Sequence, residues 1–325
     1  GYLERTYNIS SDLGKVAKIV AEKGLKGLEE INIVVGNPIR PMLAERLSSS
    51  QEIIDKVGGK MSLEYKLDGE RLQIHVKKKQ VSIFSRKLEN ITNHYPDVSS
   101  IMSEINIENI IVEAEAVAIN KENGSYLPFQ ELMHRRRKHK IEEAVKNYPI
   151  SINLFDIIFF DNEDLTDSSY ERRRKILNSI VKKNKKLDIV KNKIIQSAEE
   201  IDNFLEQSIE EGCEGLVIKD LQGTYRAGAR EYLWIKLKRE YKSEMSDTLD
   251  LVVIGAIYGK GKRVNRYGAL LLAAYDKEED MFRSFCKVGT GFSDEQLKII
   301  YEKLQKCIIK DKHAMVDSKM EVDVW

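Results

Sequence analysis

The sequence predicts an α+β fold in which antiparallel sheets and helices form a first domain and a smaller β-rich domain follows. Apolar and polar residues alternate along the segments 62–68, 72–76 and 234–238, as in half-buried strands. Helical segments interrupt these strands irregularly, without the regular repeat of a parallel sheet. With 325 residues and 42% hydrophobic content, the chain is long enough for two packed cores.

Residues 1–36 are expected to be helical and to be the truncated end of an upstream helical domain. Leu13, Val16 and Ile19 recur at helical spacing and form an apolar stripe. Such a short piece cannot bury its stripe alone, and the chain begins without an initiator Met. The segment 36–41 contains two prolines and marks the expected domain boundary.

The first domain is expected over residues 37–240, with a polar connector at 238–244. Hairpins mixed with helices favour antiparallel sheets rather than a βαβ repeat. Strands are expected at 61–67, 71–76, 80–85, 111–119, 151–160, 214–219 and 231–238, and helices at 129–146, 168–183 and 198–210.

Residues 245–325 are expected to form a partial β-barrel such as an OB-fold. Glycine- and charge-rich turns separate its three β-rich runs, and a helical stretch follows at 294–308. A closed barrel needs more strands, so this domain is expected to be truncated at its C-terminus. The three runs are 249–257, 268–275 and 281–288.

Composition excludes several classes of protein. The cysteines Cys213, Cys286 and Cys307 are scattered without a CxxC pair, which argues against a disulfide framework or a zinc site. No apolar run is long enough to span a membrane. Lys plus Arg total 53 against 52 Asp plus Glu, so nucleic-acid binding would need local patches. The basic runs 134–140 and 259–263 are candidates for phosphate contact, although charge runs are usually solvated faces.

Residues 64–71 carry the most informative pattern. Alternation places Glu64, Lys66 and Asp68 on one face of a strand that ends at an Asp-Gly turn. A lysine amine in a buried or charge-crowded site can lose its proton near neutral pH and act as a nucleophile. The alternative is a solvated strand face with a chance salt bridge.

The spacing K-x-D-G-x-R resembles the signature of the covalent nucleotidyltransferases, which include ATP-dependent DNA ligases, RNA ligases and mRNA capping enzymes. The resemblance implies that Lys66 attacks the α-phosphate of a nucleotide and forms a lysyl-nucleotide adduct. It also implies nucleotide contacts for Glu64, Arg71 and Arg86, the last in Ser-Arg-Lys after the strand at 80–85. Without the neighbouring motifs, Arg86 would be interpreted as an ordinary cation at the end of a strand.

Two carboxylates lie close together in Glu113-Ala114-Glu115, where the family has an acidic-Gly-Glu pattern. By resemblance Glu115 holds the ribose hydroxyls. Since neighbouring carboxylates repel, a cation or metal is expected nearby. Phe155 matches the aromatic residue that stacks on adenine, although an ordinary core phenylalanine is the alternative.

The segment 214–219 matches the family motif Glu-Gly-(apolar)₃-Lys, which implies that Glu214 assists metal binding and that Lys219 contacts phosphate. The two residues have opposite parity in a flat strand. Either a bulge or a position of Glu214 just outside the strand would reconcile them.

The segment 234–238 alternates again, so Lys236 and Lys238 share a face, and the family places both lysines near the phosphates. By resemblance Arg230 is a further nucleotide-contacting arginine. Gathering these cations and Lys219 around Lys66 is expected to lower the pKa of the nucleophile.

The segments 41–44, 128–138 and 251–292 resemble archaeal and eukaryotic replicative ATP-dependent DNA ligases in particular. That resemblance implies a helical DNA-binding domain, an adenylation domain and an OB-fold domain, with ATP and Mg²⁺ as cofactors. Lys66 would become adenylated, AMP would pass to the 5′-phosphate of nicked duplex DNA, and the 3′-hydroxyl would displace it. Asp68 would help to activate that hydroxyl, and Glu115 and Glu214 are the candidates for holding a metal.

The resemblance further implies a monomer that acts in DNA replication, repair, recombination and cell division, in the cytoplasm or nucleoid of an archaeon or the nucleus of a eukaryote. A sliding clamp would bind through a missing upstream segment. The family's last basic motif is absent before Trp325, so this chain is expected to adenylate itself poorly. The alternatives are an mRNA-capping-type guanylyltransferase and a non-catalytic DNA-binding scaffold with a ligase fold.

Overall fold

The computed structural model of the protein describes residues 2–105, 107–135, 141–181, 186–238, 250–259, 264, 266–277 and 279–325. The chain divides into two compact units, residues 1–244 and 245–325. None of the helices in these described ranges combines the length and the apolar character needed to cross a membrane.

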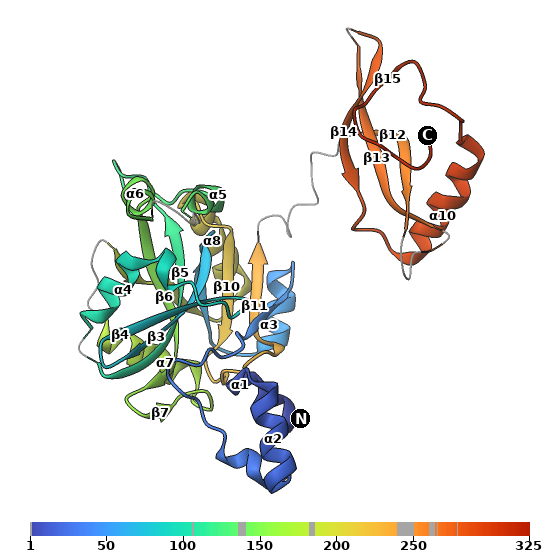
Figure 1. Ribbon diagram of the computed structural model, residues 1–325. Coiled ribbons are helices and arrows are strands. Elements are labelled where there is room, and N and C mark those ends of the chain that lie inside the picture. Colours follow the sequence, from blue (N-terminus) through green and yellow to red (C-terminus); the bar gives the residue numbers. More distant parts are fainter. Residues whose placement is uncertain are drawn as a thin grey trace. The chain divides into compact units, whose positions relative to one another are not determined.

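Two β-sheets form the centre of the first unit (Figure 1). One sheet runs in the order β1-β11-β10-β2-β9, and the other runs β4-β3-β5-β6-β7 with β8 paired to β6. Apart from β1 with β11 and β6 with β8, the neighbouring strands in both sheets pair antiparallel. The strands are β1 (Leu43–Arg46), β2 (Met61–Lys66), β3 (Glu70–Lys77), β4 (Gln80–Ser85), β5 (Asn109–Ala118), β6 (Ile150–Phe160), β7 (Glu163–Asp164), β8 (Leu187–Ile189), β9 (Asn192–Ile195), β10 (Gly215–Asp220) and β11 (Arg230–Lys238).

Helices cover the outer faces of both sheets. One apolar cluster joins the β2–β10–β11 sheet to α3 and α8, and another joins the β3–β5–β6 sheet to α4 and α7. Burial of these apolar faces is the main source of stability for such layers. The helices of this unit are α1 (Tyr2–Ser10), α2 (Leu13–Lys23), η1 (Leu25–Glu30), α3 (Ser50–Val57), η2 (Thr92–His94), α4 (Pro96–Ser103), α5 (Phe129–Met133), α6 (Ile141–Asn147), α7 (Tyr170–Ile180) and α8 (Ala198–Glu210).

Successive side chains of β2 point alternately into the apolar core and into a cavity. Leu63 and Tyr65 belong to the apolar cluster under α3 and α8. Glu64 and Lys66 alternate with them and line a cavity on the opposite face. The alternation in the sequence therefore predicted both the strand and the face that lines the cavity.

Polar side chains of β3 hold the segment that leads into β1. Gln73 bonds the backbone N–H and C=O of Ile39 at 2.7 and 3.0 Å. Burial lowers the pKa of His75 to about 3, so its neutral ring accepts the Gly36 backbone N–H at 2.9 Å. Since β1 then pairs with β11, this segment ties the two sheets together.

The second unit contains a sheet in the order β12-β13-β14-β15 (Figure 1). Its apolar cluster packs that sheet against α10, with Tyr267 and Leu270 at the centre. A bridge between Ala256 and Val324 brings the end of the chain beside β12. The elements are β12 (Val252–Tyr258), β13 (Tyr267–Asp276), β14 (Met281–Val288), α10 (Asp294–Leu304), η4 (Gln305–Cys307) and β15 (Val316–Asp317).

The strands predicted around the cavity, the helices near 168–183 and 198–210 and the β-rich runs of the second unit are confirmed within a few residues. The single helix predicted over 129–146 is wrong, because α5 ends at Met133 and α6 begins at Ile141. Residues 136–140, most of the first basic run, lie outside the described residues, as do 239–249 and 260–263. Assignment of residues 1–36 to an upstream DNA-binding domain stays a prediction.

Gly215, the first residue of β10, is required by the backbone. Its φ is +144°, and a Cβ there would lie 2.2 Å from the Leu237 carbonyl oxygen. Gly215→Ala is therefore expected to lower the free energy of unfolding by about 3 kcal/mol. Gly212→Ala, with φ of +84° and open space around the Cβ, should cost about 1 kcal/mol.

Urea denaturation followed by the fluorescence of Trp234 in a Trp325→Phe background would measure both variants in the first unit, because the chain has two tryptophans. Equal midpoints for the two alanine variants would contradict the close approach of β10 to β11.

Candidate functional site

A cavity of about 570 Å³ lies on the inner face of the β2–β10–β11 sheet. Its lining includes every residue that the sequence singled out for nucleotide, metal or catalytic roles except Asp68. Strands β2, β10 and β11 supply one wall, and β3, β5 and β6 contribute to the other. The residues brought together are Glu64, Lys66, Arg71, Arg86, Glu115, Phe155, Glu214, Lys219, Arg230, Lys236 and Lys238.

Lys66 ends β2 and forms an ion pair with Glu214, which also accepts Lys238 at 3.0 Å. Burial raises the pKa of the Glu214 carboxyl, but hydrogen bonds and charge from Lys66 and Lys238 outweigh it and hold that pKa below its usual value. Glu214 is therefore an anion that fixes the two ammonium groups side by side.

In one flat strand, Glu214 and Lys219 would point to opposite faces. The structure explains how both line the cavity, because the strand begins after Glu214. β10 begins at Gly215, which pairs with Lys66 on one side and Lys238 on the other. Glu214 lies just outside the strand and donates its backbone N–H to the Lys66 carbonyl at 2.9 Å. Of the two explanations left open by the sequence, the structure bears out this one, and no bulge is needed.

One wall of the cavity carries Lys236 and Arg230 from β11, and Arg86, which follows β4, adds a cation from the other sheet. Burial lowers the pKa of Lys236, and the charges of Arg230, Lys66 and Arg86 lower it further. Arg230 bonds the backbone carbonyl of Ala44 at 3.4 Å, which anchors it beside β1. The positive potential of this wall suits a phosphate chain.

Arg71, which lines the cavity from β3, forms a rigid pair with Glu113 on β5. The Arg71 guanidinium contacts both oxygens of the buried Glu113 carboxylate at 2.7 and 2.8 Å, and it donates to the Met42 carbonyl at 2.8 Å. Burial opposes ionisation, but Glu113 raises the pKa of Arg71 above its ordinary value. The cation expected beside Glu113 and Glu115 is therefore Arg71. The role of Glu113 as its anchor was not predicted.

Glu115 lies on the same wall and resists ionisation. Burial raises its pKa from an ordinary 4.5 to about 7, and the Glu214 and Glu70 carboxylates add to this against Lys66 and Arg71. The folded state then binds a proton more tightly than the unfolded state between these two values. The free energy of unfolding is thus expected to fall as pH rises from about 4.5 to about 7.

Glu115→Gln should remove this part of the pH dependence and make the midpoint of unfolding less sensitive over that range. The comparison is a series of urea denaturations of the first unit at pH 5 to 8. If the free energy of unfolding had the same slope against pH in the wild-type protein and the variant, this would contradict the raised pKa of Glu115.

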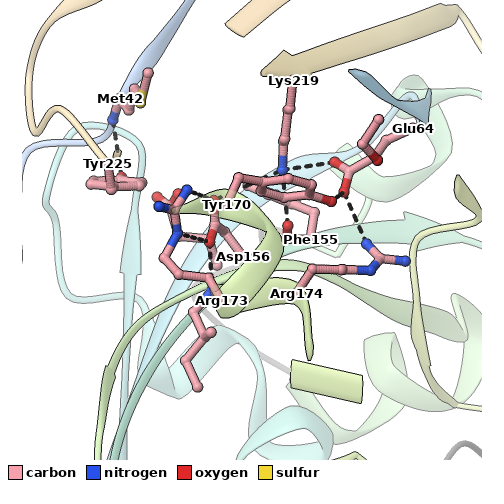
Figure 2. A network of polar contacts seen from close by, with 12 residues as sticks. Met42, Glu64, Phe155, Asp156, Tyr170, Arg173, Arg174, Lys219 and Tyr225 are labelled. Atoms are coloured by element: carbon pink, nitrogen blue, oxygen red, sulfur yellow. Dashed lines mark hydrogen bonds and ion pairs between the residues drawn. The ribbon is translucent and has the colours of Figure 1, made fainter. Parts of the chain in front are cut away.

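A buried network of charges supports the floor of the cavity (Figure 2). The Lys219 ammonium, 1% exposed, contacts Glu64 at 2.7 Å, Asp156 at 3.9 Å and the Phe155 carbonyl oxygen at 2.9 Å. Burial lowers the pKa of Lys219, and Glu64 and Asp156 counter this. Because Glu64 and Lys219 stand on the neighbouring strands β2 and β10, the network locks the register of the strand that carries Lys66.

Helix α7 contributes three side chains to this network, and none of them was predicted. Arg173 forms a two-pronged pair with Asp156 at 2.7 and 3.1 Å, and Arg174 contacts Glu64 at 2.9 Å. The Tyr170 hydroxyl donates to Glu64 as well. Figure 2 shows these side chains converging from the helix on the group around Lys219. The only available signal was their i, i+3, i+4 spacing on one helical face.

Phe155 sits beside Trp234 with ring centroids 6.1 Å apart, and the Arg71 guanidinium lies 5.3 Å from the Phe155 ring. The Phe155 side chain is only partly buried and lines the cavity. A fixed aromatic edge at the wall of a cavity is suited to packing against a flat base. Stacking on adenine stays a prediction.

Asp68 lies beside the cavity but outside its lining. Its carboxylate accepts the backbone N–H of Phe129 at 3.1 Å. Burial raises the pKa of Asp68, and the neighbouring Glu214 carboxylate adds to this while the Phe129 N–H opposes it. Its role with a 3′-hydroxyl stays a prediction.

The fit of a Mg²⁺ ion depends on the two carboxylates Glu115 and Glu214. The described part of the chain contains no cluster of three or more His, Cys, Asp and Glu arranged for a metal. Mg²⁺ is commonly bound by one or two carboxylates together with substrate phosphates, so such a cluster is not needed. Glu214 raises the pKa of Glu115, a repulsion that a divalent cation would relieve. The residues present therefore fit the ion, and their role as its ligands stays a prediction.

Comparison with known proteins identifies relatives of this chain. The family model "ATP dependent DNA ligase domain" matches residues 41–238, and "ATP dependent DNA ligase C terminal region" matches 263–325. The DNA ligase of Nitrosopumilus maritimus is 51% identical over 99% of this chain and 55% of its own length. The DNA ligase of Pyrobaculum islandicum is 53% identical over the same shares. The chain thus spans about half the length of the curated relatives it matches.

Among solved structures, mycobacterial DNA ligase D complexed with ATP and MES is similar with a TM-score of 0.51 and 21% identity. The match covers 86% of this chain and 81% of the other. At that identity the likeness concerns the fold, which combines an α+β first unit with a smaller β-rich second unit.

Proposed function

The chain belongs to the ATP-dependent DNA ligase family, and from that premise we propose that it seals nicks in duplex DNA through a lysyl-AMP intermediate on Lys66. One observation carries the proposal. Lys66 ends a strand at a cavity whose lining holds Lys236 and Lys238 from its own sheet and a carboxylate, Glu115, and an aromatic ring, Phe155, from the other sheet. This combination supports a cavity that would hold the phosphates and the nucleoside of ATP beside the nucleophile.

In the first step the Lys66 amine, once deprotonated, attacks the α-phosphorus of ATP. A nitrogen–phosphorus bond forms, the bond to the β-phosphate oxygen breaks, and pyrophosphate leaves. Glu214 holds Lys66 and Lys238 together, and Lys236 and Arg230 line the same cavity, where they would face the phosphate chain. These preorganised cations stabilise charge that develops on the transferring phosphoryl group. Bound Mg²⁺ would add Lewis-acid stabilisation of the same charge.

In the later steps AMP passes from Lys66 to the 5′-phosphate of a nick, and the 3′-hydroxyl then displaces AMP to form the phosphodiester. Asp68, at the turn after β2, is our candidate for orienting that hydroxyl. Phe155 would pack against adenine and Glu115 would accept the ribose hydroxyls, because both line the cavity from the sheet that faces Lys66. Action in DNA replication, repair and recombination, and recruitment by a sliding clamp, follow from the same proposal.

Intact mass spectrometry of the complete polypeptide tests the first step. The sample is incubated with ATP and Mg²⁺, with GTP in parallel. The expected result is a gain of one AMP mapped to Lys66, and no gain with GTP. A GMP adduct would instead favour a capping-type guanylyltransferase.

Failure to form either adduct while nicked DNA is still bound would favour a non-catalytic scaffold. Sealing of a nick that already carries AMP separates that case from a defect confined to the first step. A scaffold leaves the pre-adenylated nick open, whereas an enzyme impaired only in adenylation closes it.

A further inference from the structure

A second cavity of about 270 Å³ adjoins the cavity of Lys66, and its lining carries positive charge without any acidic residue. The two cavities share Leu43, Arg86 and Lys87. At this volume the second cavity is smaller than the usual site of a drug-sized ligand and suits a single small group. It is lined by Arg40, Pro41, Leu43, Arg86, Lys87, Leu88 and Gly228.

The charges in this cavity are not balanced by the protein. Among the described residues, the side chains of Arg86 and Lys87 make no hydrogen bond or ion pair. Arg86 and Lys87 are exposed at the mouth of this cavity, and Arg40 is partly buried. Three neighbouring cations without an acidic residue in the lining attract an anion, and a bound anion would reduce their mutual repulsion.

Arg40 is held in place before any ligand arrives. Its guanidinium donates to the Tyr7 hydroxyl at 2.6 Å and lies 4.6 Å from the centre of the Tyr7 ring. Its backbone bonds Asn8 at 2.9 Å and Gly228 at 3.1 Å. The Nε atom is buried and has no hydrogen-bond partner in the described ranges. A guanidinium that the fold already holds beside a cavity is suited to an oxyanion, because little side-chain entropy is lost on binding.

We propose that this second cavity binds a phosphate group of the nucleic-acid backbone, next to the position at which the nick meets Lys66. The inference rests on the proposed function and adds a residue, Arg40, that lines only the second cavity. A nucleic-acid strand presents phosphates at regular intervals, so a strand entering the first cavity places further phosphates over the adjoining surface. Lys236, Lys238 and Arg230 already face the first cavity, where the phosphates of ATP belong.

The test compares Arg40→Met with the wild-type complete polypeptide in two reactions. The KM for nicked duplex is measured in sealing at several salt concentrations, and the KM for ATP is measured in adduct formation. We expect Arg40→Met to raise the KM for the nick about threefold to tenfold and to reduce the salt dependence of log KM by about one unit of slope. The KM for ATP should stay unchanged, which also shows that the variant is folded.

Two further variants sharpen the comparison. Arg40→Lys keeps the charge and should recover part of the affinity and the salt slope. Lys193→Met is the matched control, since Lys193 pairs with Leu63 and so lies on the sheet face turned away from Lys66. It should leave both KM values unchanged.

Unchanged nick KM and salt slope in Arg40→Met would overturn the proposal. A raised KM for ATP with an unchanged KM for the nick would overturn it too and would assign the cavity to the nucleotide's own phosphates. Neither outcome resembles failure of the proposed function, in which the wild-type protein forms no adduct and seals no nick.

Discussion

Replacement of Lys66 by arginine is expected to abolish both AMP adduct formation and the sealing of ordinary nicks, with a loss of at least about 1000-fold. A guanidinium stays protonated, so it has no free electron pair with which to attack phosphorus. It keeps the positive charge beside Glu214, the residue that Lys66 contacts. Lost activity in Lys66→Arg would therefore report the missing nucleophile and not a missing charge. Intact mass after incubation with ATP and Mg²⁺, and sealing of a labelled nick, measure the two effects.

The matched control is Lys193→Arg, which changes a lysine in the same sheet whose side chain lies on the face away from the cavity. It should form adduct at the wild-type rate. Lys66→Arg should still close a nick that already carries AMP, because that reaction begins after the step that needs the amine. An AMP adduct on the Lys66→Arg protein would rule out Lys66 as the nucleophile.

Period-two alternation predicted β2, β3 and β11, in which apolar side chains of the core alternate with polar ones, whereas β6 was predicted as an apolar run. The clearest case is β2, where Leu63 and Tyr65 pack in the apolar core and the alternating Glu64 and Lys66 line the cavity. The same rule did not find β8 (Leu187–Ile189), whose three residues are too short to show a period and are placed by pairing with β6. Short strands depend on their neighbours, and those are not visible in the local sequence.

Eleven residues of the cavity lining could be predicted, because the motifs resemble those of a known family and parity places several of them on one strand face. The exact position of Glu214 could not be predicted, because it depends on the backbone of Gly215. The φ of Gly215 is +144°, and the strand begins at this residue, one position after Glu214. Asp68 was predicted as a catalytic residue by its place in the motif, yet the turn directs its carboxylate to the Phe129 N–H.

Helix α7 shows a different limit of sequence reading. Tyr170, Arg173 and Arg174 share a helical face with buried Leu177, and charged residues on a helix usually indicate a solvated face. Here that face is buried, and its partners lie far away in sequence, as Glu64 does from Arg174 by 110 positions. Such pairings become visible only when the fold is known.

Arg173 and Arg172 offer a direct comparison of buried and exposed arginine on this helix. Arg173 is fully buried against Asp156, whereas Arg172 is 52% exposed and pairs with Glu163 at 2.8 Å. Removing one partner of a buried pair leaves a charge without compensation, which typically costs about 3–5 kcal/mol. Arg173→Met is thus expected to lower the free energy of unfolding by about that amount. Arg172→Met should cost less than about 1 kcal/mol, as exposed ion pairs do.

Replacement of Arg173 by methionine should also affect the cavity. Asp156 contacts Lys219, and Lys219 contacts Glu64 on the strand of Lys66, so a displaced Asp156 loosens the floor beneath the nucleophile. We therefore expect Arg173→Met to slow adduct formation under conditions where the protein remains folded, whereas Arg172→Met leaves the rate unchanged. A double-mutant cycle with Asp156→Asn isolates the pair, since the double variant should lose less than the sum of the single losses. Equal stability of the two arginine variants, or additive losses in the cycle, would contradict a stabilising pair and would place the support of Lys66 elsewhere.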